Sequence, residues 1–167
     1  MKKTFILFCL LVICLVVAAQ NPCPQVIPAL QQWKGAKGSL SLPTQGNIII
    51  NPSNEEALAS TASILMKDLK ELMGWEYTIT TGKAKKNDIY LSLSQPDEQL
   101  GKEGYVLAIN NKVSIEAPTT QGVFWGTRTL LQMLYRQEAT LAKGTTRDWP
   151  EFPSRGFMLD VGRKFFT

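Results

Sequence analysis

Few residues of this sequence could do chemistry, because the chain contains no histidine. This absence excludes a Ser-His catalytic pair and the commonest zinc ligand from the 167 residues. Two pairs of neighbouring acids remain, Glu55-Glu56 and Asp97-Glu98. The first pair opens a predicted helix, where the helix dipole favours negative charge, and the second falls in a predicted loop. We interpret both as structural and expect no catalytic residue, metal or cofactor within this chain.

One arginine near the end of the sequence has a more specific chemistry available. Arg155 precedes the apolar run 156–161, and Asp160 falls inside that run. A guanidinium presents two parallel N–H donors in a rigid fork, which suits two adjacent hydroxyls of a sugar. The alternative is structural: Arg155 closes the end of a strand or pairs with Asp160. On residue types alone the structural pairing is favoured, since most ion pairs are merely structural.

The start of the sequence has the order of a secretory signal peptide. Lys2 and Lys3 precede an apolar run over residues 5–17, and small residues follow at 17–19. The apolar run is shorter than the roughly 20 residues of a membrane span, so a retained anchor is the weaker alternative. We expect residues 1–19 to be removed and the protein to be exported, to the periplasm, the cell surface or the medium.

Removal of that segment also changes the charge and the cysteine content. Without Lys2 and Lys3 the formal charge of +4 falls to +2, so we expect no nucleic-acid-binding face. The lysines at 83, 85 and 86 are then interpreted as a solvated turn. Cys23 alone remains, which excludes an internal disulfide. The polar residues before Cys23 argue against a lipid anchor there.

The first predicted elements are a strand and a helix. Residues 20–46 are rich in proline and glycine and predict an irregular leading segment, and residues 47–50 form a β-branched run typical of a strand. Ser53 and Glu56 have the spacing of a capping box at a helix start, and Gly74 ends that helix. Its expected inward face is Leu58, Ala62, Leu65, Leu69 and Leu72.

Four more strands and a second helix follow. Alternating or β-branched runs predict strands at 77–80, 89–94, 105–109 and 113–115. Asn110-Asn111 can adopt the left-handed backbone of a tight hairpin. Thr119 is a plausible N-cap for a helix that fades near Arg136, and Gly144 marks a loop. The expected inward face of this second helix is Val123, Phe124, Thr127, Leu130, Leu131 and Leu134.

This order of elements predicts an α+β fold over residues 47–147. Two helices with one apolar face each must bury that face against the strands, which favours a two-layer sandwich. We expect a mainly antiparallel sheet with both helices on one face.

The last 20 residues do not fit that domain. Residues 148–153 form a linker bounded by prolines, and residues 156–161 form a nearly continuous apolar strand. A run without alternation is typical of a strand buried on both faces of a parallel sheet. The sequence offers no parallel neighbour for it, so residues 148–167 are interpreted as a linker and the first strand of a second, larger domain.

The residues around this linker resemble glycoside hydrolase family 20. The segment Asp148-Trp149-Pro150, then Phe152-Pro153-Ser154-Arg155-Gly156-Phe157-Met158-Leu159-Asp160-Val161, Arg163 and Phe165, resembles the start of the family's catalytic barrel. Upstream, Ala117-Pro118-Thr119, Gly122-Val123-Phe124-Trp125-Gly126 and Thr129-Leu130-Leu131-Gln132 resemble the last helix of its N-terminal domain. Many members carry Arg-His where this sequence has Arg163-Lys164, so no histidine role is carried over.

The resemblance implies an exo-acting β-N-acetylhexosaminidase with a (β/α)8 barrel of about 250 residues, of which this chain would hold the first strand. In that family the 2-acetamido oxygen of the substrate attacks the anomeric carbon, assisted by an Asp-Glu pair on the barrel. Asp97-Glu98 precedes the barrel segment, so the catalytic pair is expected beyond the chain. Arg155 matches the arginine that binds the C3 and C4 hydroxyls of a terminal N-acetylglucosamine or N-acetylgalactosamine. Asp160 is expected to orient Arg155 or Arg163.

Two alternatives stay open. The small domain could be a stand-alone module that binds a glycan or a partner, or the leading domain of another glycosidase. A finished module that ended on a buried-type apolar strand would expose an aggregation-prone edge, which favours the enzyme.

Four aromatic residues could stack on sugars, and they are Trp125, Trp149, Phe157 and Phe165. We expect them to pack against other residues instead.

Overall fold

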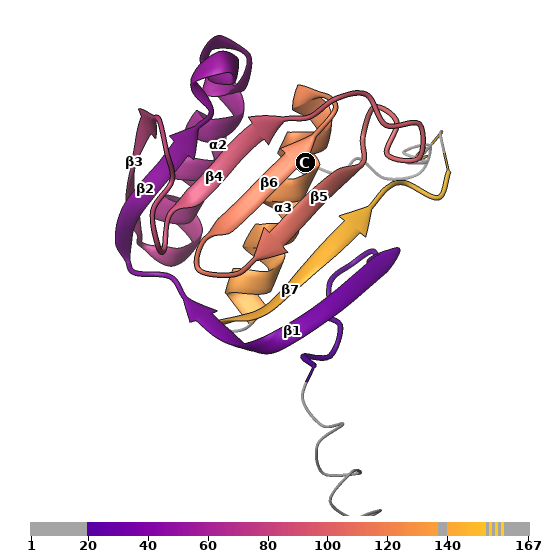
Figure 1. Cartoon of the computed structure of the whole chain (residues 1–167), viewed down its shortest axis with the longest axis horizontal. Helices are drawn as coiled ribbons and strands as arrows, with labels where there is room; N and C mark the ends of the chain where they lie inside the picture. The colour runs from indigo at the N-terminus through magenta and orange to yellow at the C-terminus, as the bar shows by residue number, and fades with distance from the viewer. Residues whose placement is uncertain (1–19, 137–139, 153, 155, 157, 159–167) are drawn as a thin grey trace, which may run out of the picture.

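The computed structural model describes residues 20–136, 140–152, 154, 156 and 158. Seven strands form one sheet in the order β1-β7-β5-β6-β4-β2-β3. Their bounds are Gln32–Ser41 for β1, Gln45–Ile50 for β2, Glu76–Thr81 for β3, Ile89–Leu93 for β4, Tyr105–Ile109 for β5, Val113–Ala117 for β6 and Thr140–Asp148 for β7. Both α-helices, α2 (Glu55–Met73) and α3 (Thr120–Arg136), cover the same face of this sheet (Figure 1). The α+β class and the two-layer arrangement are therefore confirmed.

The sheet is mixed, and the direction of pairing changes at β6. Strands β1, β7, β5 and β6 are antiparallel neighbours, whereas β6, β4, β2 and β3 are parallel. Parallel neighbours need a crossover connection, and α2 supplies the one between β2 and β3.

Neither α2 nor α3, the helices of the described residues, has the length and apolar character of a membrane span.

The core lies between the sheet and the two helices. Leu58, Leu65 and Leu69 of α2 and Leu130 and Leu134 of α3 are fully buried, as their spacing predicts. Alternate residues of the strands meet them, because successive side chains of a strand point to opposite faces. The fully buried strand residues include Ile48, Ile89, Leu91, Leu107, Ile109, Val113 and Ile115. Leu72 is 58% exposed, so its place on the predicted inward face was wrong.

The first helix begins differently from the predicted capping box. A 3-10 turn (Pro52–Asn54) precedes α2, and the Asn51 side chain accepts a hydrogen bond from the Ser53 amide at 3.1 Å. Ser53 is thus a donor within the turn, and the prediction of a Ser53–Glu56 box was wrong. The Asn54 side chain accepts from the Leu93 amide at 3.0 Å instead of capping α2, which ties the helix start to the end of β4.

The other helix ends were predicted correctly. Gly74 ends α2 with a left-handed backbone, φ 69°, and its amide donates to the Lys70 carbonyl. The Thr119 hydroxyl accepts a hydrogen bond from the Gly122 amide at 3.1 Å and so caps α3. Residues 110–112 connect β5 to β6 as expected, but the prediction of a left-handed backbone at Asn110-Asn111 was wrong, because Asn87 is the one non-glycine residue with positive φ in the described part of the chain.

Two glycine-containing segments predicted as irregular are strands. Residues 32–41 form β1, which pairs with β7, so the prediction that 20–46 is irregular was wrong there. Gly144 lies within β7, not in a loop. The Trp33 ring occupies the space where a side chain at position 144 would stand. A Cβ on Gly144 would lie 2.3 Å from the ring. Glycine is required here for a close approach and not for a turn.

Candidate functional site

The two residues that the sequence singles out for sugar binding, Arg155 and Asp160, lie outside the described residues. The aromatic candidates Phe157 and Phe165 lie outside them too. Trp125 and Trp149 are described, and both line the same hollow at the end of β7, where the chain leaves the sheet. This hollow is the best-formed candidate site in the described part of the chain.

The hollow has a volume of about 650 Å³ and a largely apolar lining. Tyr105 from β5 and Thr129 from α3 line it from the core side, and Trp125 of α3 is 39% exposed. The remaining residues that contribute to it are Ile27, Pro28, Ala29, Leu30, Gln31, Glu103, Gln132, Asp148, Trp149, Pro150, Glu151 and Phe152. Four segments therefore meet here: residues 27–31, the start of β5, one face of α3, and residues 148–152.

A hydrogen-bond network centred on Tyr105 joins these segments. The Tyr105 hydroxyl donates to Asp148 Oδ2 at 2.7 Å and lies 2.6 Å from the Thr129 hydroxyl. Asp148 Oδ1 accepts from the Gln31 amide at 2.9 Å. Burial raises the pKa of Tyr105 above its ordinary value, and the neighbouring Asp148 carboxylate adds to the rise. The Tyr105 hydroxyl therefore stays protonated and donates its hydrogen bond throughout the neutral pH range.

A side-chain amide fixes the segment on the other side of the hollow. Gln132 of α3 accepts from the Ile27 amide and donates to the Ile27 carbonyl, each at 3.0 Å. One side chain thus satisfies both backbone groups of one residue. Together with the bond from Gln31 to Asp148, this holds residues 27–31 against α3 and the end of β7.

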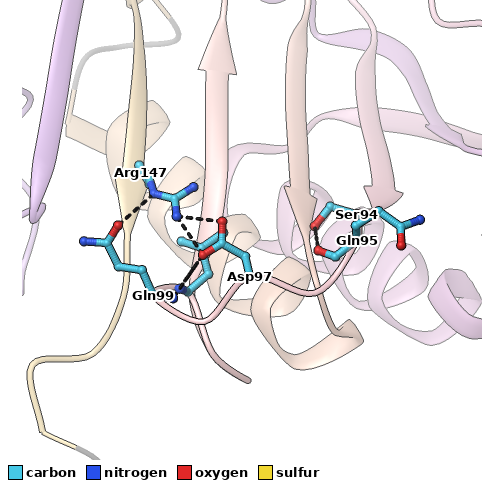
Figure 2. A network of polar contacts seen from close by, with 6 residues as sticks. Ser94, Gln95, Asp97, Gln99 and Arg147 are labelled. Atoms are coloured by element: carbon cyan, nitrogen blue, oxygen red, sulfur yellow. Dashed lines mark hydrogen bonds and ion pairs between the residues drawn. The ribbon is translucent and has the colours of Figure 1, made fainter.

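Asp97, one of the acids considered for catalysis, is bound within the loop between β4 and β5. Arg147 of β7 donates to both oxygens of Asp97, at 2.6 and 2.7 Å, and to Gln99 at 3.3 Å (Figure 2). The amides of Gln99 and Leu100 donate to Asp97 Oδ1. These hydrogen bonds, that from Arg147 above all, lower the pKa of Asp97. The interpretation of Asp97-Glu98 as a loop pair agrees with this geometry.

The hollow therefore offers a shaped apolar surface and not an acid–base site. Tyr105 stays protonated, and both oxygens of Asp148 are engaged in hydrogen bonds. Such a surface can receive a sugar ring or an apolar side chain, because exposed aromatic rings favour both. The sequence placed Tyr105 on a buried strand face but gave no sign of its bond to Asp148, which is 43 residues away.

The match to a family model shows the family of this chain. Residues 23–149 match the family model described as glycosyl hydrolase family 20, domain 2. A lacto-N-biosidase of Bifidobacterium bifidum is 32% identical over 138 residues, which are 81% of this chain and 12% of that protein. A beta-hexosaminidase of Porphyromonas gingivalis is 29% identical over 153 residues, which are 85% of this chain and 19% of that protein.

A solved structure gives the same result. A mutant Streptomyces plicatus beta-hexosaminidase in complex with its product GlcNAc has a TM-score of 0.72 to this chain at 27% identity. The match covers 89% of this chain and 31% of that one, so this chain spans less than a third of the length of each of these relatives. The chain belongs to glycosyl hydrolase family 20, and its residues 23–149 form the domain that the family counts as its second.

Proposed function

We propose that this chain is the amino-terminal part of an exo-acting β-N-acetylhexosaminidase, which removes terminal N-acetylglucosamine or N-acetylgalactosamine from glycans. The observation that carries the proposal is the match of residues 23–149 to the family domain, followed after five residues by the segment from Arg155 to Asp160. Two relatives named beta-hexosaminidase support it, and one of them is named in complex with GlcNAc.

The proposed chemistry is retaining and substrate-assisted. The acetamido oxygen of the substrate attacks the anomeric carbon, and the leaving oxygen takes a proton from a carboxylic acid. An oxazoline forms, and water then opens it with the same carboxylate acting as base. Both members of the catalytic Asp-Glu pair are assigned to the part of the protein beyond Thr167, and Arg155 is assigned to the hydroxyls at C3 and C4. Asp160 is assigned to orienting Arg155 or Arg163.

In this proposal the small domain supports the barrel and does no chemistry. The hollow lined by Tyr105, Trp125 and Trp149 is the surface that contacts the barrel. The network of Asp148, Tyr105 and Gln31 fixes where the linker leaves the sheet. Residues 1–19 act as an export signal, so the substrate is met outside the cytoplasm.

The reading frame beyond Thr167 gives the first test. We expect an Asp-Glu pair at the end of a later barrel strand, and a frame without such a pair would exclude a hexosaminidase. The purified 167-residue chain should not hydrolyse an aryl N-acetylglucosaminide, whereas the full-length protein should. Arg155→Ala in the full-length protein should lose most of its kcat/KM with an unchanged melting temperature, and wild-type kinetics would make Arg155 structural.

One relative suggests a second substrate. The Bifidobacterium protein is named a lacto-N-biosidase, and its identity to this chain, 32%, exceeds the 29% of the Porphyromonas protein. An aryl lacto-N-bioside assayed beside the aryl N-acetylglucosaminide separates the two activities. Turnover of the disaccharide substrate alone would assign the full-length protein to that activity.

A further inference from the structure

A second hollow, far from the first, is lined by lysines and amides. It has a volume of about 380 Å³ and lies between the loop that joins β3 to β4 and the turn that joins β5 to β6. Its lining consists of Ala84, Lys85, Lys86, Asn110, Asn111, Lys112 and Ser114. We call these seven residues the lysine hollow. The sequence alone predicted that Lys85 and Lys86 lie in a solvated turn. The structure shows that Lys112, from a different segment, lies beside them in this hollow.

The two segments of the lysine hollow are held together by hydrogen bonds. The Asn87 amide donates to the Asn111 carbonyl at 2.8 Å, and the Val113 amide donates to the Asp88 carbonyl at 3.0 Å. The buried Asp88 carboxylate accepts from the Lys85 amide at 2.6 Å and from the Asn47 side chain at 3.2 Å. The positions of the lysine-bearing loops are therefore fixed by backbone hydrogen bonds and by the Asp88 carboxylate, and do not depend on the lysine side chains.

The lysine hollow carries an excess of positive charge. Lys85 and Lys86 are exposed, with exposed Lys83 beside them in the same loop. Within the described part of the chain, none of the lysines at 83, 85, 86 and 112 forms an ion pair. Asp88, the acid in the same loop, is buried and already accepts two hydrogen bonds. Clustered like charges repel each other and raise the local concentration of anions.

The neutral groups around these charges suit a sugar. Asn110 and Asn111 offer amide donors and acceptors, and Ser114 offers a hydroxyl. Ser114 is paired with Tyr90 in the neighbouring strand β4. Both are half-buried and alternate with fully buried residues of their strands, so they lie on the face of the sheet turned away from the core. Lys112 Nζ lies 4.8 Å from the centre of the Tyr90 ring, which orients one ammonium group beside an aromatic surface. Amide and hydroxyl groups can bind the hydroxyls of a sugar, whereas a phosphate alone would need the charges only.

The position of the lysine hollow separates it from the proposed catalytic region. Ile109, next to the turn, pairs with Gly144 of β7, whereas Tyr105 pairs with Asp148 at the strand's other end. The turn between β5 and β6 therefore lies at the opposite end of the sheet from the linker (Figure 1). A ligand bound there does not compete with the apolar hollow.

We propose that the lysine hollow binds an anionic polysaccharide, one whose sugar units carry sulfate or carboxylate groups. The ammonium groups of Lys85, Lys86 and Lys112 neutralise the anionic groups, and Asn110, Asn111 and Ser114 bind the hydroxyls between them. This binding goes beyond the proposed hydrolysis, and its test is independent of catalysis.

The test measures binding of the purified chain to chondroitin sulfate, with dextran as the neutral polymer. We expect saturable binding to the sulfated polymer and none to dextran. The affinity should fall steeply between about 0.01 M and about 0.15 M salt, where the screening length drops from about 30 to about 8 Å. The triple variant K85Q/K86Q/K112Q should bind on the order of a hundredfold more weakly, since each lysine near an anionic surface contributes about 1 kcal/mol.

The matched control is K67Q/K70Q/K102Q, which removes the same charge at exposed positions of α2 and of the loop before β5. We expect its affinity to stay within about twofold of wild type, since net charge alone contributes little. K85Q/K86Q keeps Lys112 on the Tyr90 ring and serves as the second variant if the triple variant is unfolded. Equal losses in control and lysine-hollow variants would overturn the proposal. Binding to phosphatidylglycerol vesicles without binding to chondroitin sulfate would overturn the assignment to a glycan.

Discussion

Tyr105 shows at the scale of one residue how this domain fixes the point where its chain leaves the sheet. Its hydroxyl bonds to a carboxylate of β7 and lies within hydrogen-bond distance of a hydroxyl of α3, and all three side chains line the apolar hollow. Tyr105 is 3% exposed, so water cannot replace these bonds without a structural change. The residue therefore couples core stability to the position of the linker.

Removing the Tyr105 hydroxyl tests this coupling. We expect Tyr105→Phe to lower the free energy of unfolding by about 1–3 kcal/mol, because it removes buried hydrogen bonds and leaves Thr129 short of a partner. Denaturant unfolding of the chain measures the change. Tyr135→Phe is the control, since Tyr135 of α3 is 73% exposed, and we expect no change there. Equal stability of the two variants would show that the Tyr105 network contributes nothing.

Trp125 gives a prediction about what covers the hollow. Trp125 is 39% exposed on α3 and packs edge-on against Phe124, with ring centres 5.3 Å apart. If residues after the linker cover it, Trp125→Ala should lower the melting temperature of this domain more in the full-length protein than in the 167-residue chain. Tyr135→Ala should have the same small effect in both. An equal effect of Trp125→Ala in both proteins would mean that the hollow stays open.

At the scale of elements, the glycines of α3 determine how closely the helix approaches the sheet. A Cβ on Gly122 would lie 2.3 Å from the Gly104 carbonyl oxygen, and one on Gly126 would lie 2.5 Å from Ile115 Cγ2. Neither distance is tolerated by packed atoms. The two glycines are therefore needed for contact with β6 and with the loop before β5, and not for a turn in the backbone.

We therefore expect Gly122→Ala to destabilise the domain although alanine is the better helix former. The overpacking should cost about 1–3 kcal/mol, more than the gain of about 1 kcal/mol in helix propensity. Thermal unfolding measures the difference. Ser60→Ala, on the exposed side of α2, is the control and should be neutral or slightly stabilising. A stabilised Gly122→Ala variant would contradict the close approach.

The loop between β4 and β5 has a pH dependence of known sign. Arg147 lowers the pKa of Asp97 in the folded state. The ionised Asp97 therefore stabilises the folded state fully above the ordinary carboxyl pKa of about 3.9, and this stabilisation is lost as the pH falls through the lower pKa of the folded state. We expect the melting temperature of Asp97→Asn to lie below that of wild type at pH 7, and the difference between the two melting temperatures to shrink below about pH 4. Thermal melts across that range measure it, with Glu98→Gln as the control. A gap that stays constant down to the lowest pH would contradict the role of the carboxylate.

The helices and strands also show which parts of the fold the sequence could predict. Gly74, Thr119 and the inward leucines of both helices other than Leu72 depend on contacts within a few residues, and the structure confirms them. Strand β1 and Gly144 depend on a pairing of segments more than 100 residues apart, where glycine makes room for the Trp33 ring. Local patterns carry no information on that pairing, so glycine was interpreted as a sign of a loop.

The candidate site was predictable only in part, for the same reason. Trp125 and Trp149 were named as aromatics of interest, and the fold brings them to one hollow. The bond between Tyr105 and Asp148, and the meeting of Lys85 with Lys112, arise from strand order and not from spacing along the chain. The roles of Arg155 and Asp160 remain predictions.

At the scale of the whole molecule, this domain is one part of a longer enzyme in its relatives. It spans 31% of the Streptomyces protein and 12–19% of the two curated relatives. The fold described here has one apolar hollow at the linker and one lysine hollow at the opposite end of the sheet. In the proposed enzyme the first contacts the barrel and the second holds anionic polymer.

The most direct test of the proposed enzyme is the rate of the full-length protein on aryl glycosides that differ only at the 2-acetamido group. Fluorine atoms on the acetyl methyl withdraw electrons from the carbonyl oxygen, which is the nucleophile in substrate-assisted catalysis. We predict that kcat/KM falls steeply with each fluorine added and that the glucoside without an acetamido group is not hydrolysed. Equal rates across the series, or efficient hydrolysis of the plain glucoside, would contradict the assignment.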